Sequence, residues 1–83
     1  MATAQDICEA ITPMLKLLAN HPESMRVDMV PEDGGFVMRV QVTHQDAGRL
    51  IGMQGRTARS LRVLLGAIAV RNGLKAKLDI VEG

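Results

Sequence analysis

The chain has 83 residues, of which 47% are hydrophobic and 23% charged, and its formal net charge at pH 7 is +1. This length and composition predict one small soluble globular domain and exclude a disordered or membrane-spanning chain. Because residues 1–6 lack the basic start and apolar stretch of a signal peptide, we expect a cytoplasmic protein. The single cysteine, Cys8, and the two histidines, His21 and His44, are too few for a structural zinc site, so we expect no disulfide, metal or cofactor.

The first predicted element is a helix that Asp6 caps and that His21-Pro22 ends. Its apolar residues recur at helical spacing, at Ile7, Ala10, Ile11, Met14 and Leu18. Pro13 interrupts this pattern because it has no backbone N–H. Either the helix kinks there, or a second short helix begins with Thr12 as its cap.

Two strands follow, because apolar and polar residues alternate over 25–29 and again over 36–42. The intervening segment, Pro31 to Gly35, has the composition of a turn. The pair therefore predicts an antiparallel hairpin with one face on a core, formed by Phe36, Met38, Val40 and Val42 on the second strand.

The second half of the chain predicts a short helix from Gln45 or Asp46 to Ile51, a longer one from Arg56 to about Asn72, and a strand over 77–81. The expected core face of the long helix comprises Ala58, Leu61, Leu64, Leu65, Ile68 and Ala69. Its arginines, Arg56, Arg59, Arg62 and Arg71, fall on the other side. A small apolar stripe also turns away from the core and comprises Val63, Gly66, Ala67 and Val70. Either the first helix covers this stripe, or it is a subunit contact.

Charge is distributed unevenly along the chain. Residues 1–46 carry three basic and seven acidic side chains, whereas residues 47–83 carry seven basic and two acidic ones. No acid occurs from Ala47 through Leu78. This polarity favours a polyanionic partner for the second half of the chain.

Two glycines three residues apart, Gly52 and Gly55, lie between the two predicted helices and are followed directly by Arg56. Without side chains at these positions, a sugar-phosphate backbone can approach the main chain, and amide groups at the start of the next helix can face the anion. A bare Gly-x-x-Gly is weak evidence, and a structural turn is its default interpretation. Its position between two helices, after a hairpin and before basic residues, favours nucleic-acid binding.

In this context the chain resembles the KH family of nucleic-acid-binding domains, whose GXXG loop clamps about four unpaired nucleotides. The order α-β-β-α-α-β is similar to type II KH domains, and residues 48–62 resemble the small bacterial KhpA proteins. The resemblance implies an α+β fold with three helices on one face of a three-stranded sheet, formed by residues 1–83 as a single KH domain. It implies RNA binding by Arg49, Ile51, Gly52, Met53, Gln54, Gly55, Arg56, Thr57 and Arg59, with Ile51 lining an apolar groove for the bases.

The chain departs from the family pattern at Met53-Gln54, where family members usually have a basic residue, often lysine. We therefore expect weaker binding with a shallower salt dependence, unless Arg49 or Arg59 substitutes. Base stacking is not expected, because Phe36 is the only aromatic residue.

The sequence lacks the residues of a phosphate-binding NTPase loop and any His-carboxylate constellation beside a nucleophile, so we expect no enzyme. The expected function is binding of single-stranded RNA with broad specificity, in the manner of an RNA chaperone-like regulator. We expect a homodimer through Val63, Gly66, Ala67 and Val70, and the resemblance implies a possible larger KH-containing partner. Two alternatives remain open, namely a protein-interaction module with secondary nucleic-acid affinity and a helix-turn-helix DNA binder.

Overall fold

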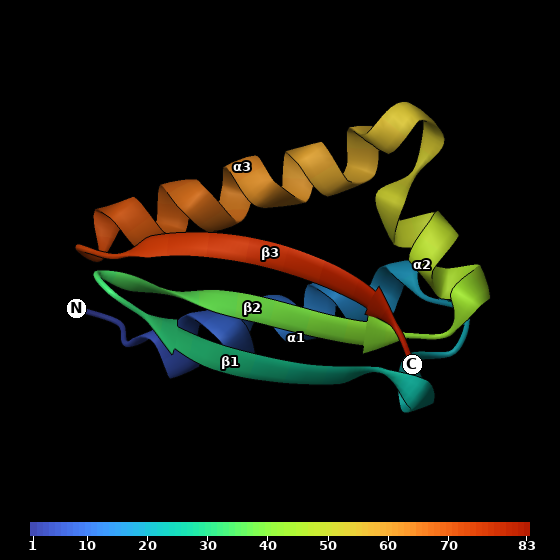
Figure 1. The fold of residues 1–83 in the computed structure, drawn as a ribbon, viewed down its shortest axis with the longest axis horizontal. Helices are drawn as coiled ribbons and strands as arrows, with labels where there is room; N and C mark the ends of the chain where they lie inside the picture. Colours follow the sequence, from blue (N-terminus) through green and yellow to red (C-terminus); the bar gives the residue numbers. More distant parts are fainter.

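The computed structural model describes residues 1–83 and has the predicted order of elements (Figure 1). The elements are α1 (Ala4–Leu18), β1 (Arg26–Glu32), β2 (Gly35–Val42), α2 (His44–Ile51), α3 (Arg56–Arg71) and β3 (Lys75–Glu82). Single 3₁₀ turns, η1 (Pro22–Ser24) and η2 (Met53–Gly55), precede β1 and α3. The predicted α+β fold, with three helices and a three-stranded sheet, is confirmed. None of the helices is both long enough and apolar enough to cross a bilayer.

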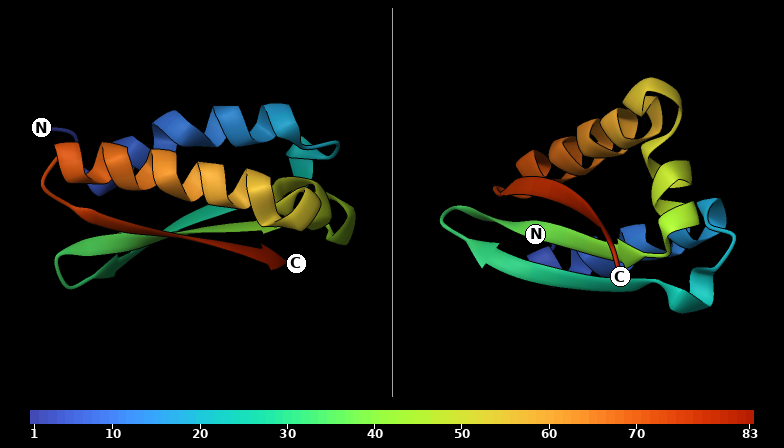
Figure 2. Two further views of the ribbon diagram at one scale, coloured as in Figure 1. Left: turned by 90° about the horizontal axis from the view of Figure 1, so that it is seen from above. Right: turned by 45° about the vertical axis from the view of Figure 1, so that its right-hand side comes forward.

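The sheet has the order β1-β2-β3, with β1 antiparallel and β3 parallel to β2. Asp33 and Gly34 alone connect β1 to β2, and Gly34 has a φ of +77°, which glycine adopts without strain. The helices lie on one face of the sheet (Figure 2). The predicted core positions of β2 are confirmed, because Phe36, Met38, Val40 and Val42 are all buried against the helices.

Helix α1 begins slightly earlier than predicted. Its N-cap is Thr3, whose hydroxyl accepts a hydrogen bond from the Asp6 N–H at 3.1 Å, while the Asp6 carboxylate accepts one from the Thr3 N–H at 2.9 Å. Asp6 is therefore the third residue of a capping box and not the cap itself. The helix continues through Pro13, so the prediction of a second helix starting at Thr12 is wrong.

The buried face of α1 also differs from the expected one, since it comprises Ile7, Cys8, Ile11 and Leu15. Ala10, Met14 and Leu18, which the helical pattern places on the core side, are exposed. Pro13 lies on the exposed side of the helix, so its ring takes no place in the core.

Helix α2 is held in place by a buried carboxylate that the sequence did not reveal. Thr43 caps the helix by accepting a hydrogen bond from the Asp46 N–H. The Asp46 side chain is fully buried, and its two oxygens accept hydrogen bonds from the N–H groups of Asn20 at 2.9 Å and His21 at 2.8 Å. Asp46 thus ties α2, the helix that leads into the glycine loop, to the segment that follows α1.

Helix α3 has the predicted bounds to within one residue, and Ala58, Leu65 and Ala69 are buried as expected. Leu61 and Ile68 are half-buried against the core, whereas the prediction for Leu64 is wrong, because its side chain is 45% exposed. Leu64 lies at the edge of the core-facing side of α3, between the exposed Val63 and the buried Leu65.

Candidate nucleic-acid interface

The segment between α2 and α3 adopts backbone conformations that are common for glycine and rare for other residues. Gly52 has φ 75° and ψ 174°, a conformation almost restricted to glycine, and Gln54 and Gly55 are both left-handed, at φ 57° and 73°. The Gly52 N–H donates to the Gly48 carbonyl at 2.9 Å, and the Gly55 N–H donates to the Gly52 carbonyl at 3.1 Å. These bonds end α2 and reverse the chain within one turn.

The two glycines are required for different reasons. A Cβ atom on Gly52 would overlap the side chain of Thr57 in the first turn of α3. A Cβ atom on Gly55 would meet no other atom within 4 Å. Gly52 therefore permits close packing within the protein, whereas Gly55 leaves open space in front of the backbone.

The start of α3 differs from that of the other two helices. Thr3 and Thr43 cap α1 and α2 with their side chains, and each of those helices has an aspartate in its first turn. No side chain caps α3, and its first turn contains no acid. Because the first N–H groups of a helix carry the positive end of its dipole, this N-terminus can receive an anion without displacing a side chain of the protein.

Three arginines lie in the helical turns on either side of the glycine loop. Arg49 lies in the last turn of α2, and Arg56 and Arg59 lie in the first turn of α3. All three are exposed and none forms an ion pair within the chain. The Arg56 guanidinium donates a hydrogen bond to the Gln54 side-chain oxygen at 3.2 Å, so the neutral loop residue orients a cation without neutralising it.

The apolar residues expected at the site are also exposed, with Met53 79% and Ile51 43% accessible. Ile51 lines none of the surface hollows, so the base-binding groove expected beside it stays a prediction. A shallow hollow does occur along α3 and is lined by Arg59, Ser60, Val63, Leu64 and Ala67. It joins the predicted RNA-binding and dimer residues into one continuous surface.

The apolar stripe of α3 is not covered by α1, so that alternative is wrong. Val63 is 68% and Val70 72% exposed, and Ala67 is exposed as well. Leu64, predicted in the core, extends this stripe. A helical pattern locates such a border residue only to within about one position, because 100° per residue leaves the edge of the buried face undefined.

Thr43 and Asp46 hold α2 in place but are not among the site residues predicted from the sequence. Their Thr-x-x-Asp spacing is the signature of a helix start, and this signal could have placed the N-terminus of α2. It could not have shown that the Asp46 carboxylate reaches the backbone of Asn20 and His21, because that contact depends on the tertiary fold.

Comparison with known proteins identifies the family of the chain. The KhpA/KhpB KH domain family matches residues 8–80. The chain is 37% identical over 76 residues to a protein named RNA-binding protein KhpA from Leifsonia xyli, covering 92% of this chain and 97% of that protein. It is 35% identical over 74 residues to the protein of the same name from Listeria monocytogenes, covering 89% and 97%, and 31% identical over 80 residues to that from Bacillus subtilis, covering 96% and 99%. The fold, the glycine loop and this match over most of the chain establish that it belongs to the KhpA/KhpB family of KH-domain proteins.

Proposed function

We propose that this chain is a non-catalytic protein that binds single-stranded RNA, acting as a single KH domain in the cytoplasm. The observation that carries the proposal is the open, uncapped start of α3, which the glycine loop leaves accessible and which unpaired arginines flank. The relatives named RNA-binding protein KhpA support the choice of RNA.

In the proposed complex a phosphate lies in the open space at Gly55, beside the positive end of the α3 dipole. Arg56 and Arg59 neutralise the neighbouring phosphates, and Arg49 approaches from α2. These groups contact the backbone and position it without reading bases, so binding is broad in sequence. A KH loop engages about four nucleotides, which is too short a segment for tight or selective binding by one copy.

Self-association compensates for this short footprint. We propose a homodimer through the α3 stripe, with Gly66 permitting close approach of a second backbone between Val63, Ala67 and Val70. Joining two loops raises the effective concentration of the second for the same RNA. The same surface can accept a larger KH-containing partner, and an RNA chaperone-like role follows from weak, broad and multivalent binding.

A second candidate function is a protein-interaction module with secondary affinity for nucleic acid. The exposure of Val63, Leu64 and Val70 favours it, as does the absence of a basic side chain inside the loop. The two functions use neighbouring surfaces and can coexist in one protein.

The test replaces Met53-Gln54 with two aspartates and titrates the protein against a labelled, unstructured RNA. Both side chains are exposed, so the fold should persist while carboxylates repel the phosphates and binding is lost. The matched control places two aspartates at the exposed α1 residues Met14 and Leu17 and should retain most of the affinity. Equal affinity of the loop variant and the parent would exclude the loop as the site. Preferential competition by duplex DNA would instead support the helix-turn-helix interpretation.

A further inference from the structure

The outer edge of β1 carries unpaired backbone groups. β1 is the first strand in the order β1-β2-β3, so only its β2 side is hydrogen-bonded within the chain (Figure 1). Only Asp33 and Gly34 connect the two strands of the hairpin, so Glu32 and Gly35 form a hydrogen-bonded pair. From there along β1, residues that are hydrogen-bonded to β2 alternate with residues whose backbone groups point away from β2. Val27 and Met29 therefore direct their N–H and C=O groups outward. Pro31, which has no N–H to offer the sheet, occupies an outward position in the same alternation.

The edge sequence Met25-Arg26-Val27-Asp28-Met29 is self-complementary in antiparallel pairing. With Val27 opposite Val27 of a second copy, each Met25 faces Met29 and each Arg26 faces Asp28. The two Val27 residues exchange both backbone hydrogen bonds, and each Met29 N–H donates to the Met25 carbonyl across the interface. The Met25 N–H needs no further partner, because it donates to the Pro22 carbonyl at 3.1 Å.

Other registers that bring outward backbone groups together are less complementary. A shift of the partner strand in one direction places Arg26 opposite Arg26 of the second copy, and a shift in the other direction places Asp28 opposite Asp28. In both registers like charges oppose each other across the interface. A further shift pairs Arg26 with Glu32, but Glu32 already lies 3.4 Å from the Lys77 ammonium. The register centred on Val27 is thus the one in which Arg26 and Asp28, neither of which has an ion-pair partner within its own chain, face each other on both sides of the two-fold axis.

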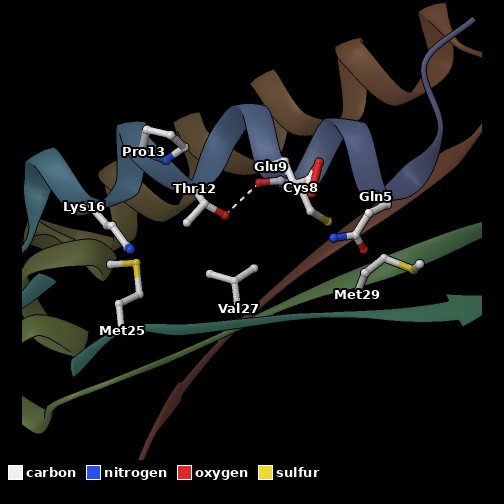
Figure 3. Close-up of a pocket in the computed structure, with 9 residues that line it drawn as sticks. All are labelled: Gln5, Cys8, Glu9, Thr12, Pro13, Lys16, Met25, Val27 and Met29. Carbon is white, nitrogen blue, oxygen red and sulfur yellow. Dashed lines mark hydrogen bonds between the residues drawn. The ribbon is translucent and has the colours of Figure 1, made fainter. Parts of the chain in front are cut away.

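A groove beside this edge supports the same symmetry. It has a volume of about 360 Å³ and lies between α1 and the core-side residues of β1 (Figure 3). Lys16 stands over its Met25 end, whereas Gln5 stands over its Met29 end with Glu9 toward the same side. Neither Glu9 nor Lys16 forms an ion pair within the chain. Two-fold pairing brings the basic end of one groove beside the acidic end of the other.

We propose that β1 is a self-association surface, through which two copies pair antiparallel at Val27 and join their sheets into one continuous sheet. This surface is separate from the α3 stripe, since α3 packs mainly on β3, at the opposite edge of the sheet. The proposal does not depend on RNA binding. A chain that uses both surfaces assembles beyond a dimer and presents several glycine loops to one RNA.

The experiment reverses single charges at the β1 edge. The variants are made in a Val70→Glu background, which should prevent association through the α3 stripe. Arg26→Asp places acid against acid across the two-fold axis, and Asp28→Arg places base against base. Arg26 and Asp28 are exposed, and the sheet neighbour of Arg26 is Gln41, so Arg26→Asp breaks no ion pair within the chain. Asp33→Arg, in the hairpin turn outside the paired segment, is the control for the change in net charge that Asp28→Arg makes.

Sedimentation velocity over a concentration series should show that each edge variant self-associates roughly tenfold more weakly than the Val70→Glu parent. Mixing the two edge variants should restore association, because the introduced aspartate of one copy then faces the introduced arginine of the other, while the unchanged Asp28 faces the unchanged Arg26. The Asp33→Arg control should match the parent. Unchanged self-association of both edge variants, or a mixture that associates no more tightly than its components, would overturn the β1 proposal.

Discussion

The side chain of Thr57 occupies the space that a Cβ atom on Gly52 would need. This contact joins the residue that ends α2 to the first turn of α3, and it holds the glycine loop against the body of the protein. Gly55, three residues later, makes no such contact. The glycine pair therefore has one member that serves the fold and one that faces outward.

From this relationship we predict that Gly52→Ala destabilises the protein more than Gly55→Ala. Alanine at Gly52 must adopt a backbone conformation almost restricted to glycine and also displace Thr57, at a cost of roughly 2–4 kcal/mol in the free energy of unfolding. Alanine at Gly55 meets only the left-handed backbone penalty, about 1 kcal/mol. Urea denaturation of both variants measures the difference, and Gly52→Ala/Thr57→Gly should recover part of the loss. Equal destabilisation by the two single variants would contradict the contact.

The Asp46 carboxylate should make stability depend on pH in the acid range. Burial of the carboxylate raises its pKa. The hydrogen bonds from the backbone N–H groups of Asn20 and His21 lower it, and so do the nearby charges of His21 and Arg49. Together the lowering effects are larger, and the pKa lies below its ordinary value of 3.8. A depressed pKa in the folded state stabilises the protein above the pKa of the unfolded chain, and this contribution is lost as pH falls through the folded value.

We therefore predict that Asp46→Asn lowers the free energy of unfolding at pH 7 and that the gap from the parent narrows as pH decreases below about 4. Asparagine retains one acceptor oxygen but presents an amide donor to a backbone N–H, so it cannot satisfy both bonds. Denaturant titrations at several pH values measure the gap. The exposed turn residue Asp33, changed to Asn, is the control and should leave the pH dependence close to that of the parent. A gap that stays constant down to about pH 2 would argue against the ionised carboxylate as the source.

The arginines around the glycine loop should determine the salt dependence of RNA binding. Arg56→Ala and Arg59→Ala each remove one proposed phosphate contact, so the slope of log affinity against log salt should become shallower by about 0.7 for each. Arg71→Ala removes the same charge at the far end of α3 and should change the slope little. Fluorescence anisotropy with a single-stranded RNA over a range of salt concentrations measures the slopes. If Arg71→Ala reduced the slope as much as Arg56→Ala, binding would be due to overall charge and not to the loop.

The α3 stripe should control formation of the proposed homodimer. Val70 is 72% exposed and lies away from the glycine loop, so Val70→Glu should introduce charge into the interface without affecting the proposed phosphate contacts. Sedimentation velocity should show a smaller particle for this variant. Leu17→Glu replaces an even more exposed apolar residue on α1 and should leave the mass unchanged. A particle of the parent's mass after Val70→Glu would remove the stripe as the interface.

The sequence by itself determined the order of the elements, the core-facing residues of β2 and the location of the glycine loop. These follow from local rules, since alternation selects strands, a recurrence near 3.6 residues selects helices, and glycine marks the turn between them. The arginines of α3 were likewise placed in solvent by the same periodicity that buries Leu65 and Ala69.

Only the tertiary structure decided which side of α1 is buried, that Asp46 reaches the backbone of Asn20 and His21, and that Gly52 packs on Thr57. It also placed β1 at the edge of the sheet, with unpaired groups beside a groove. These features depend on contacts between segments far apart in the chain or on the rotation of a helix about its own axis. A periodic pattern gives the width of a buried face but not what packs against it, because the partner is set by the whole fold.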